Sequence, residues 1–486
     1  MIYRLRPYQE DCVKSISDYI NSDRRDPVLI VAPVAAGKSI LIAEAARLMG
    51  DKTLVFQPSR ELLTQNHDKI TSYGIPATIY SASCGKKELS NMIYATLGSI
   101  KKVVGQLKEM GIRNVLIDEA HAGYSPEDGS EFMTFMNELK PRKVIGFTAT
   151  PCRLKNMSIG QTSYSQLNFI TRMRPVYFKN LIHVIQVEEM IRQGFWTPLK
   201  YETWDFNGDA LKLNSNGSEY TAESISEAVR KNGLNNLILR RLMVLKDVCR
   251  SILVFMDSVE SCNTAAEWMN AKICAGMAEV VHGGTPKKQR EAIVERFKSG
   301  KTKVVFNYSA LGTGFDHPGL DCVIVGRPTF SFSSFYQWLG RAVRIKDGKD
   351  SALVVDCCNN SSRFGDIRKL SIENYKGYGW GMFIGDKLIT NIPMGDKVTK
   401  TDLDIKAAKK DRRRGLAQGI TASPVPGRPD HPLGSTVMTF GKYSGWMLHS
   451  IPVSYFKFIN ETFDWDNDRN KEIKEYIDFL IKNNRL

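Results

Sequence analysis

Long apolar runs and paired cysteines are what this sequence lacks. No run approaches the roughly 20 apolar residues that a membrane-spanning helix needs, and the opening MIYRLRPYQED holds no apolar stretch of a signal peptide. Nine cysteines are scattered without a C-x-x-C pair or a nearby histidine set of zinc-ligand spacing. These absences predict a cytoplasmic protein with reduced cysteines, no zinc cluster and no membrane partner.

Length and charge favour a large enzyme that meets a polyanion. A chain of 486 residues is too long for one ordinary core, so two domains and a small addition are expected. Lys and Arg total 67 against 52 for Asp and Glu, a net charge of +15. This sign is typical of nucleic-acid binding, although a solvated positive face is the alternative reading.

Short β-branched runs recur along the chain, bounded by Gly, Pro or polar residues. In the first 200 residues they lie at 28–32, 53–56, 115–117 and 144–147, with helical patterns at 39–49 and 60–72. The series restarts at 252–255, 279–281, 303–307, 322–325 and 352–355, with a helical pattern at 287–297. Apolar strands that alternate with helices predict an α/β class with two tandem parallel-sheet lobes.

Composition shifts suggest where these lobes begin and end. We expect the first lobe at residues 1–200, followed at 201–395 by an interlobe connection and the second lobe. The polar stretch 207–233 is expected to form part of that connection. Residues 396–432, which include the basic run 409–414, predict a basic linker, and 433–486 predict a small accessory module.

A phosphate-binding loop follows the first predicted strand. The segment APVAAGKS at 32–39 runs directly into a helical pattern, which is the context in which backbone N–H groups cradle phosphates. Lys38 can reach the β- and γ-phosphates of ATP, and Ser39 can ligate Mg²⁺. The other predicted nucleotide contacts of the loop are Pro33, Val34, Ala35, Ala36 and Gly37. An ordinary strand-to-helix turn is the alternative.

Two adjacent acids end a later apolar strand. In the segment VLIDEAH at 115–121, Asp118 and Glu119 follow three apolar residues typical of a buried strand. Burying a carboxylate is costly, so two at this point indicate a functional role. Asp118 can hold a metal through water, and Glu119 can orient and deprotonate an attacking water molecule. A strand cap with incidental charge is the alternative, and it becomes improbable once the phosphate loop precedes it.

Two further elements complete the predicted nucleotide site. Near the N-terminus, Gln9 is a candidate reader of the adenine edge, with Arg6 beside it. In the second lobe, Arg341 and Arg344 are three residues apart and share one helix face. Projected across a cleft, they can stabilise the transition-state charge as arginine fingers. A solvated basic helix face is the alternative.

Taken in order, these motifs resemble those of superfamily 2 helicases over nearly 350 residues. They are LRPYQ (5–9), APVAAGKS (32–39), PSRELLTQ (58–65), DEAH (118–121), TATP (148–151), VFMDSVES (254–261), ALGTGFDHPGLD (310–321) and QWLGRAVR (337–344). The resemblance implies RecA-like lobes, with Ala35 standing where helicases usually carry glycine. The pattern is most similar to phage branch-migration helicases of the UvsW type and to cellular relatives that open with LRPYQ and carry a DEAH or DECH box.

The resemblance also implies roles that spacing alone does not. It places on the nucleic-acid track Pro58, Arg60, Glu61, Phe255, Ser258, Gly312 and Thr313. It assigns to the coupling of hydrolysis with lobe movement His121, Thr148, Ala149, Thr150 and Gln337. Asp316 would face the nucleotide ribose. The segment FGKYSG at 440–445 resembles an FGKYKG-type module of some nucleases, either an accessory DNA contact or a structural cap.

The expected function is therefore that of an ATP-dependent DNA helicase or translocase. It would act on forked, branched or single-stranded DNA, mainly through the backbone, in replication, recombination or repair. A phage-encoded protein would work in the host cytoplasm. Two alternatives stay open: an RNA helicase, and a nucleic-acid-binding module whose ATPase is impaired by Ala35.

Overall fold

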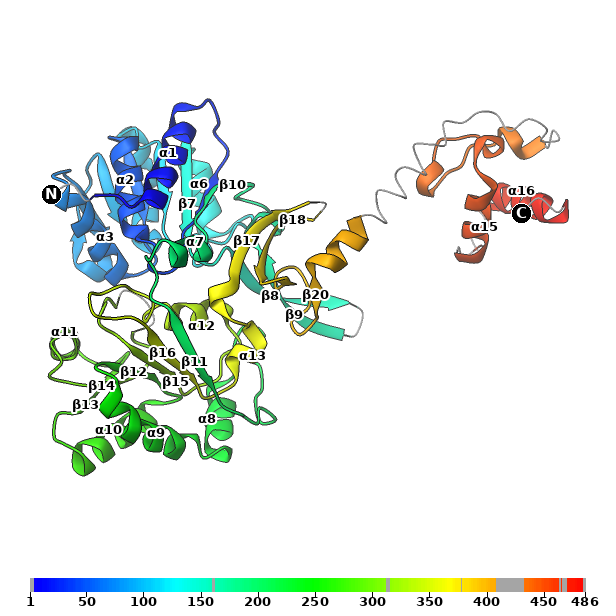
Figure 1. Cartoon of the computed structure of the whole chain (residues 1–486). Coiled ribbons are helices and arrows are strands. Elements are labelled where there is room, and N and C mark those ends of the chain that lie inside the picture. Colours follow the sequence, from blue (N-terminus) through cyan, green and yellow to red (C-terminus); the bar gives the residue numbers. More distant parts are fainter. Residues whose placement is uncertain are drawn as a thin grey trace. The chain divides into compact units, whose positions relative to one another are not determined.

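The computed structural model divides the chain into two compact units, Met1–Asp404 and Ile405–Leu486 (Figure 1). It describes residues 4–159, 162–311, 315–376, 378–407, 432–462, 465 and 470–483. The basic run 409–414 of the predicted linker, together with Gly312 and Thr313, lies outside these residues. The first unit contains two large sheets, and each is flanked by helices.

The first sheet has eight strands in the order β10-β1-β7-β6-β2-β5-β3-β4. The strands are β1 (Val28–Val31), β2 (Thr53–Phe56), β3 (Thr78–Ser81), β4 (Lys86–Lys87), β5 (Met92–Ala95), β6 (Asn114–Ile117), β7 (Lys143–Thr148) and β10 (Asn180–Val184). The helices are α1 (Pro7–Asn21), α2 (Lys38–Met49), α3 (Arg60–Ser72), α4 (Leu97–Ile100), α5 (Val104–Glu109), α6 (Glu131–Leu139) and α7 (Val187–Arg192). All pairs are parallel except β3 with β4, and every residue of the central strands is buried.

The second sheet has six strands, all parallel, in the order β11-β16-β15-β12-β14-β13. The strands are β11 (Leu199–Thr203), β12 (Ile252–Phe255), β13 (Ala278–His282), β14 (Val304–Tyr308), β15 (Cys322–Val325) and β16 (Ala352–Asp356). The helices are α8 (Ala222–Lys231), α9 (Leu234–Val248), α10 (Val259–Lys272), α11 (Lys287–Lys298), α12 (Phe332–Leu339) and α13 (Asn360–Phe364). The predicted α/β class with two parallel-sheet lobes is confirmed.

The crossing between the sheets lies earlier than predicted. β11 pairs with β16, so the second sheet is already joined at residue 199, and residues 185–198 make the crossing. The stretch 207–233 is therefore not the connection, and that prediction was wrong. It contains α8, whose residues Ile225 and Val229 pack into the second core. The polar composition of the stretch hid an amphipathic helix with one narrow apolar face.

Two antiparallel additions were not predicted. A hairpin of β8 (Cys152–Ile159) and β9 (Thr162–Phe169) follows the first lobe's last core strand. A small sheet of β17 (Leu370–Tyr375), β18 (Gly379–Ile384), β19 (Lys387–Leu388) and β20 (Val398–Thr399) follows the second lobe.

This late sheet is tied back to the first lobe by side-chain amides. Gln186 donates from Nε2 to the Ile372 carbonyl at 2.8 Å and accepts from the Ile372 N–H at 3.2 Å. Asn391 accepts from the Phe169 N–H at 3.0 Å, and its own N–H donates to the Leu167 carbonyl at 2.7 Å. The chain thus returns to its first lobe after completing the second.

The second unit has its own small core, built around α15 (Val453–Thr462) and α16 (Lys471–Lys482). Tyr443 of the FGKYSG segment is 9% exposed and packs in this core. The exposed aromatic side chains among the described residues of this unit are Trp446 and Phe458, which lie outside that segment. The packing of Tyr443 favours the structural-cap reading of the motif.

Seven of the nine cysteines are buried, and all nine thiols are free. Within the described ranges, no helix is long and apolar enough to cross a bilayer.

Candidate nucleotide-binding site

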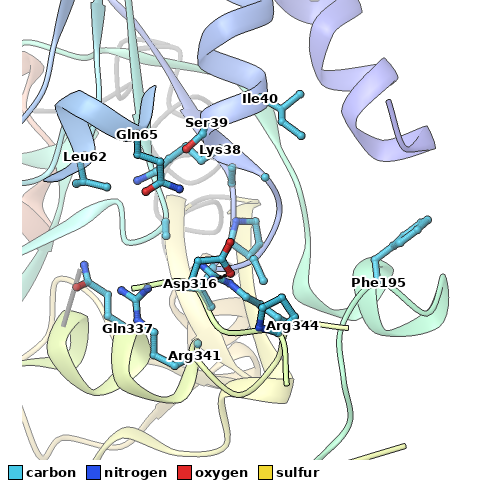
Figure 2. A pocket seen from close by; sticks show the side chains of 18 of the residues that line it. Lys38, Ser39, Ile40, Leu62, Gln65, Phe195, Asp316, Gln337, Arg341 and Arg344 are labelled. Atoms are coloured by element: carbon cyan, nitrogen blue, oxygen red, sulfur yellow. Dashed lines mark hydrogen bonds and ion pairs between the residues drawn. The ribbon is translucent and has the colours of Figure 1, made fainter. Parts of the chain in front are cut away.

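A pocket of about 360 Å³ lies between the two large sheets. The first lobe lines it with Arg6, the phosphate loop, Glu119 and Ala149. The second lobe lines it with Asp316, Gln337, Arg341 and Arg344. Figure 2 shows Lys38 and Ser39 around the same pocket as Gln337, Arg341 and Arg344. Residues more than 300 positions apart in the sequence thus meet at one site.

The phosphate loop turns sharply between β1 and α2. Gly37 has φ +80 and precedes the first residue of α2, and a Cβ at this position would lie 2.5 Å from Gln9 Nε2. Ala35 also adopts a left-handed conformation, with φ +65. Glycine takes this conformation freely, whereas an alanine pays a steric cost. The loop therefore keeps the tight geometry of a phosphate cradle despite the alanine.

Lys38 and the two acids form a buried charge cluster. The Lys38 ammonium lies 3.0 Å from Asp118 Oδ1 and also pairs with Glu119 Oε1. Burial opposes the positive charge, but the two carboxylates raise the pKa of Lys38 above its ordinary value. Asn66 donates to Asp118 Oδ2 at 3.0 Å, and the Glu119 N–H donates to Asp118 Oδ1 at 2.8 Å. These contacts fix both acids at the tip of β6.

The donor set fits a magnesium ion shared with phosphates. Ser39 offers a hydroxyl and Asp118 a carboxylate, which are the hard oxygen donors that Mg²⁺ prefers. In the described part of the chain, no group of three or more His, Cys, Asp or Glu side chains could hold a metal by itself. Mg²⁺ commonly binds through one or two protein oxygens and completes its shell with phosphates and water.

The two arginines are anchored at the edge of the pocket by the segment that precedes them in the second lobe. Arg341 donates from Nη1 to the Phe315 carbonyl at 2.7 Å. Arg344 pairs with the Asp316 carboxylate and donates to the same carbonyl at 3.3 Å. Burial, and then the neighbouring Arg344, lower the pKa of Arg341. Asp316 lines the pocket, as a ribose contact must, but here its carboxylate pairs with Arg344.

A hydrogen-bonded network crosses from one lobe to the other. His121 Nδ1 lies 2.8 Å from Thr148 Oγ1, and its Nε2 lies 3.3 Å from Ser333 Oγ. Ser333 Oγ also lies 3.1 Å from Thr150 Oγ1. Burial, and then Lys38, lower the pKa of His121 to about 3, so the ring is neutral. Ser333 lies in the first turn of α12, the helix that carries Gln337, and no motif in the sequence marked it.

The proposed adenine reader is placed differently from the prediction. Both polar atoms of the Gln9 amide are engaged by backbone: Nε2 donates to the Ala36 carbonyl at 2.8 Å, and Oε1 accepts from the Arg6 N–H at 3.0 Å. Gln9 is buried and hydrogen-bonds to the backbone of the phosphate loop. Arg6 does line the pocket, and its guanidinium lies 4.6 Å from the ring centroid of Phe195. Phe195, which also lines the pocket, was missed.

The predicted nucleic-acid residues are split between surface and core. Pro58, Arg60 and Glu61 are exposed at the start of α3. Ser258 caps α10 by accepting from the Ser261 N–H at 3.0 Å. Phe255 is 2% exposed and stacks on Trp338 with centroids 4.9 Å apart, so its placement on a strand-binding surface is corrected. An aromatic ring at the end of a buried strand gains more from the core than from solvent.

Two family models match the chain in sequence order. "Type III restriction enzyme, res subunit" matches residues 2–153, and "Helicase conserved C-terminal domain" matches residues 235–346. The two matched segments fall on the first and second lobes and include the loop, the paired acids and both arginines.

The chain belongs to the superfamily 2 helicases.

Individual relatives of this helicase agree with that assignment. It is 23% identical to the "Putative ATP-dependent helicase IRC3" of Saccharomyces cerevisiae over 74% of this chain and 52% of the yeast protein. It is 24% identical to the "DNA 3'-5' translocase XPB2" of Sulfurisphaera tokodaii, over 72% of this chain and 80% of that protein. The helicase spans 52% to 65% of the length of three of its curated relatives, the yeast protein among them.

A solved structure supports the fold alone. The fragment structure of a putative HsdR subunit of a type I restriction enzyme from Vibrio vulnificus YJ016 matches with a TM-score of 0.54 and 18% identity. The match covers 75% of the helicase and 67% of that chain. The likeness supports the predicted fold of two RecA-like parallel-sheet lobes.

Proposed function

We propose that this helicase hydrolyses ATP with Mg²⁺ and uses the energy to move along DNA, unwinding or branch-migrating forks and junctions as UvsW-type helicases do. One observation carries the proposal. Lys38 and Glu119 of the first lobe and Arg341 and Arg344 of the second line a single pocket of about 360 Å³. Because the site is complete only when the lobes meet, nucleotide binding is linked to their closure.

The pocket residues divide the chemistry of γ-phosphoryl transfer. Lys38 compensates the charge of the β- and γ-phosphates, and Mg²⁺ held by Ser39 and Asp118 adds positive charge there when bound. Glu119 orients a water molecule and accepts its proton as the water oxygen attacks the γ-phosphorus. The bond to the β–γ bridging oxygen breaks, so that ADP and phosphate form. Arg341 and Arg344 stabilise the charge that develops in the transition state.

The first test removes the charges that the reaction needs. We expect Lys38→Ala and Glu119→Gln each to abolish DNA-stimulated ATPase activity, measured as phosphate release. Matched controls are Lys108→Ala and Glu109→Gln, which change the same residue types on the exposed face of α5. Turnover within a few-fold of wild type in either pocket variant would overturn the assigned role.

DNA is the proposed track because the names of the relatives favour it. The archaeal relative is named as a DNA translocase, and the chain's charge of +15 suits a polyanion. Contacts to phosphates give little sequence preference and a steep dependence on salt. ATPase stimulation by forked DNA, duplex DNA and single-stranded RNA therefore separates the substrates. Stronger stimulation by RNA would replace this proposal with an RNA helicase.

Two substitutions test the track itself. Arg60 is exposed at the start of α3, whereas Phe255 is buried. Arg60→Ala should raise the DNA concentration needed for half-maximal stimulation and make binding less sensitive to salt. Phe255→Leu should lower the thermal midpoint and leave that DNA concentration unchanged. The reverse pattern would return Phe255 to the strand-binding surface and remove Arg60 from it.

A further inference from the structure

The crossing between the two sheets carries a buried tryptophan. Residues 195–198 form an irregular segment between α7 and β11. Trp196 lies within it, is 2% exposed, and donates from Nε1 to the carbonyl of Val34 at 2.9 Å. Val34 belongs to the phosphate loop. The chain that links the lobes is thus bonded directly to the element expected to hold the phosphates.

The next residue binds the other side of the pocket. The Thr197 N–H donates to the Val343 carbonyl at 2.8 Å, and the Thr197 Oγ1 donates to the Arg344 carbonyl at 2.7 Å. Both acceptors lie in the turn of residues 340–344 that carries Arg341 and Arg344. We call this segment the arginine turn. Two adjacent residues of the crossing therefore bridge the phosphate loop and the arginine turn.

A second contact brings the same two elements together. A Cβ added to Gly340, at the start of the arginine turn, would lie 2.6 Å from Val34 Cβ. Val34 is therefore held from the crossing by Trp196 and packed from the second lobe by Gly340. A displacement of the phosphate loop must also displace the arginine turn, because these neighbours are close-packed.

We propose that Trp196 and Thr197 form a strap that positions the arginine turn relative to the phosphate loop. They are positioning residues, since they touch neither the expected phosphates nor the water. The strap keeps both arginines at the distance from Lys38 that the transition state needs. This role is additional to the proposed ATPase and, where turnover is the readout, rests on it.

The strap predicts an effect on turnover rather than on nucleotide affinity. An interaction that matters mainly in the transition state lowers kcat and kcat/KM together and leaves KM nearly unchanged. Trp196→Phe removes the N–H donor and leaves the Val34 carbonyl without it. Such a loss corresponds to about a tenfold fall in kcat. We expect that fall for Trp196→Phe, with a KM for ATP within about twofold of wild type.

Matched variants separate positioning from general packing. Trp204→Phe removes a comparable indole hydrogen bond, to Glu202 at 2.9 Å, at a residue that does not line the pocket. It should leave kcat unchanged. Thr197→Val removes the hydroxyl and keeps the side-chain shape, so it should lower kcat, whereas Thr197→Ser keeps the hydroxyl and should restore it. If Trp196→Phe does not fold, the Thr197 pair decides the question.

A second readout does not depend on ATP turnover. Amide hydrogen exchange should speed up in both segments 33–37 and 341–345 when either strap residue is changed, and in neither segment with Trp204→Phe. If the wild-type protein had no DNA-stimulated ATPase activity, the proposed function would be refuted. The hydrogen-exchange measurement would still test the strap. The strap is overturned if Thr197→Val leaves both kcat and exchange at wild-type values, or if Thr197→Ser is as impaired as Thr197→Val.

Discussion

Gly340 of the second lobe packs directly on Val34 of the phosphate loop. An added Cβ would lie 2.6 Å from both Val34 Cβ and Val34 Cγ2, closer than real Cβ contacts allow. The glycine is needed here for close approach rather than for backbone freedom, because its own φ is −60.

Gly340→Ala should therefore push the lobes apart at the pocket. Forcing a methyl group into close packing typically costs about 1–3 kcal/mol, so we expect weaker nucleotide binding and a slower ATPase. Nucleotide affinity by titration calorimetry measures the effect. Gly105→Ala is the control, since a Cβ at Gly105 meets nothing within 4 Å. Equal affinity in both variants would show that the contact is not held during nucleotide binding.

Ser333→Ala should weaken the link between DNA binding and hydrolysis. The Ser333 hydroxyl touches Thr150 and His121 across the cleft, and one such hydrogen bond contributes about 1 kcal/mol, or about fivefold in rate. We expect DNA stimulation of the ATPase to fall by about that factor while the KM for ATP stays the same. Ser334→Ala, whose hydroxyl bonds only locally to Ser331 at 3.1 Å, should behave as wild type. Full stimulation in Ser333→Ala would exclude this path.

Ala35→Gly should preserve or increase stability and activity. A left-handed conformation costs a non-glycine residue about 1–2 kcal/mol, which glycine avoids. The greater conformational freedom of glycine in the unfolded chain offsets about 0.4–1 kcal/mol of this stabilisation. The net change is therefore between about 0 and about 1.6 kcal/mol in favour of glycine. Thermal denaturation and ATPase assays measure it, with Ala36→Gly as the control. A less active Ala35→Gly protein would mean that the alanine serves the loop for another reason.

His121 makes stability depend on pH on the acid side. Its pKa falls from an unfolded value near 6.5 to about 3 in the folded protein, mainly because burial disfavours the charged ring. The unfolded state therefore binds more protons between these values, and this contribution is complete above pH 6.5 and is lost as pH falls. The slope is at most about 1.4 kcal/mol per pH unit.

His121→Asn removes that titration. The thermal midpoint of wild type should thus fall faster than that of His121→Asn between pH 6.5 and pH 5, and the gap between the two proteins should narrow on acidification. Parallel midpoints across this range would show that folding does not lower the pKa of His121.

The sequence was informative where burial is continuous. The predicted strand 252–255 matches β12 at both ends. All four side chains of β12 are buried, and a strand covered on both faces needs an unbroken apolar run. The hairpin of β8 and β9 was not predicted, because its residues are mostly polar. The segment around Asn391 that it bonds to also lies more than 200 residues away.

The sequence predicted the site residues whose side chains carry the chemistry. It did not reveal the residues that act by donating hydrogen bonds to backbone carbonyl oxygens. Lys38, Glu119 and Arg341 stand in recognisable motifs, and the structure brings them to one pocket. Trp196 and Thr197 act on carbonyl oxygens, which every residue possesses, so no motif marks their targets. Gln9 was misplaced for a related reason: its amide satisfies the loop's own backbone instead of pointing into the pocket.

The return of the chain from residue 370 onward sets a limit on how this protein can be divided. A fragment that stopped after the first large sheet would leave the Gln186 amide without its paired backbone and the Phe169 N–H without the Asn391 oxygen. The hairpin edge would then face water and other copies of itself. A fragment that ends between the lobes would thus tend to aggregate, whereas a fragment that ends near residue 404 keeps all of these hydrogen bonds.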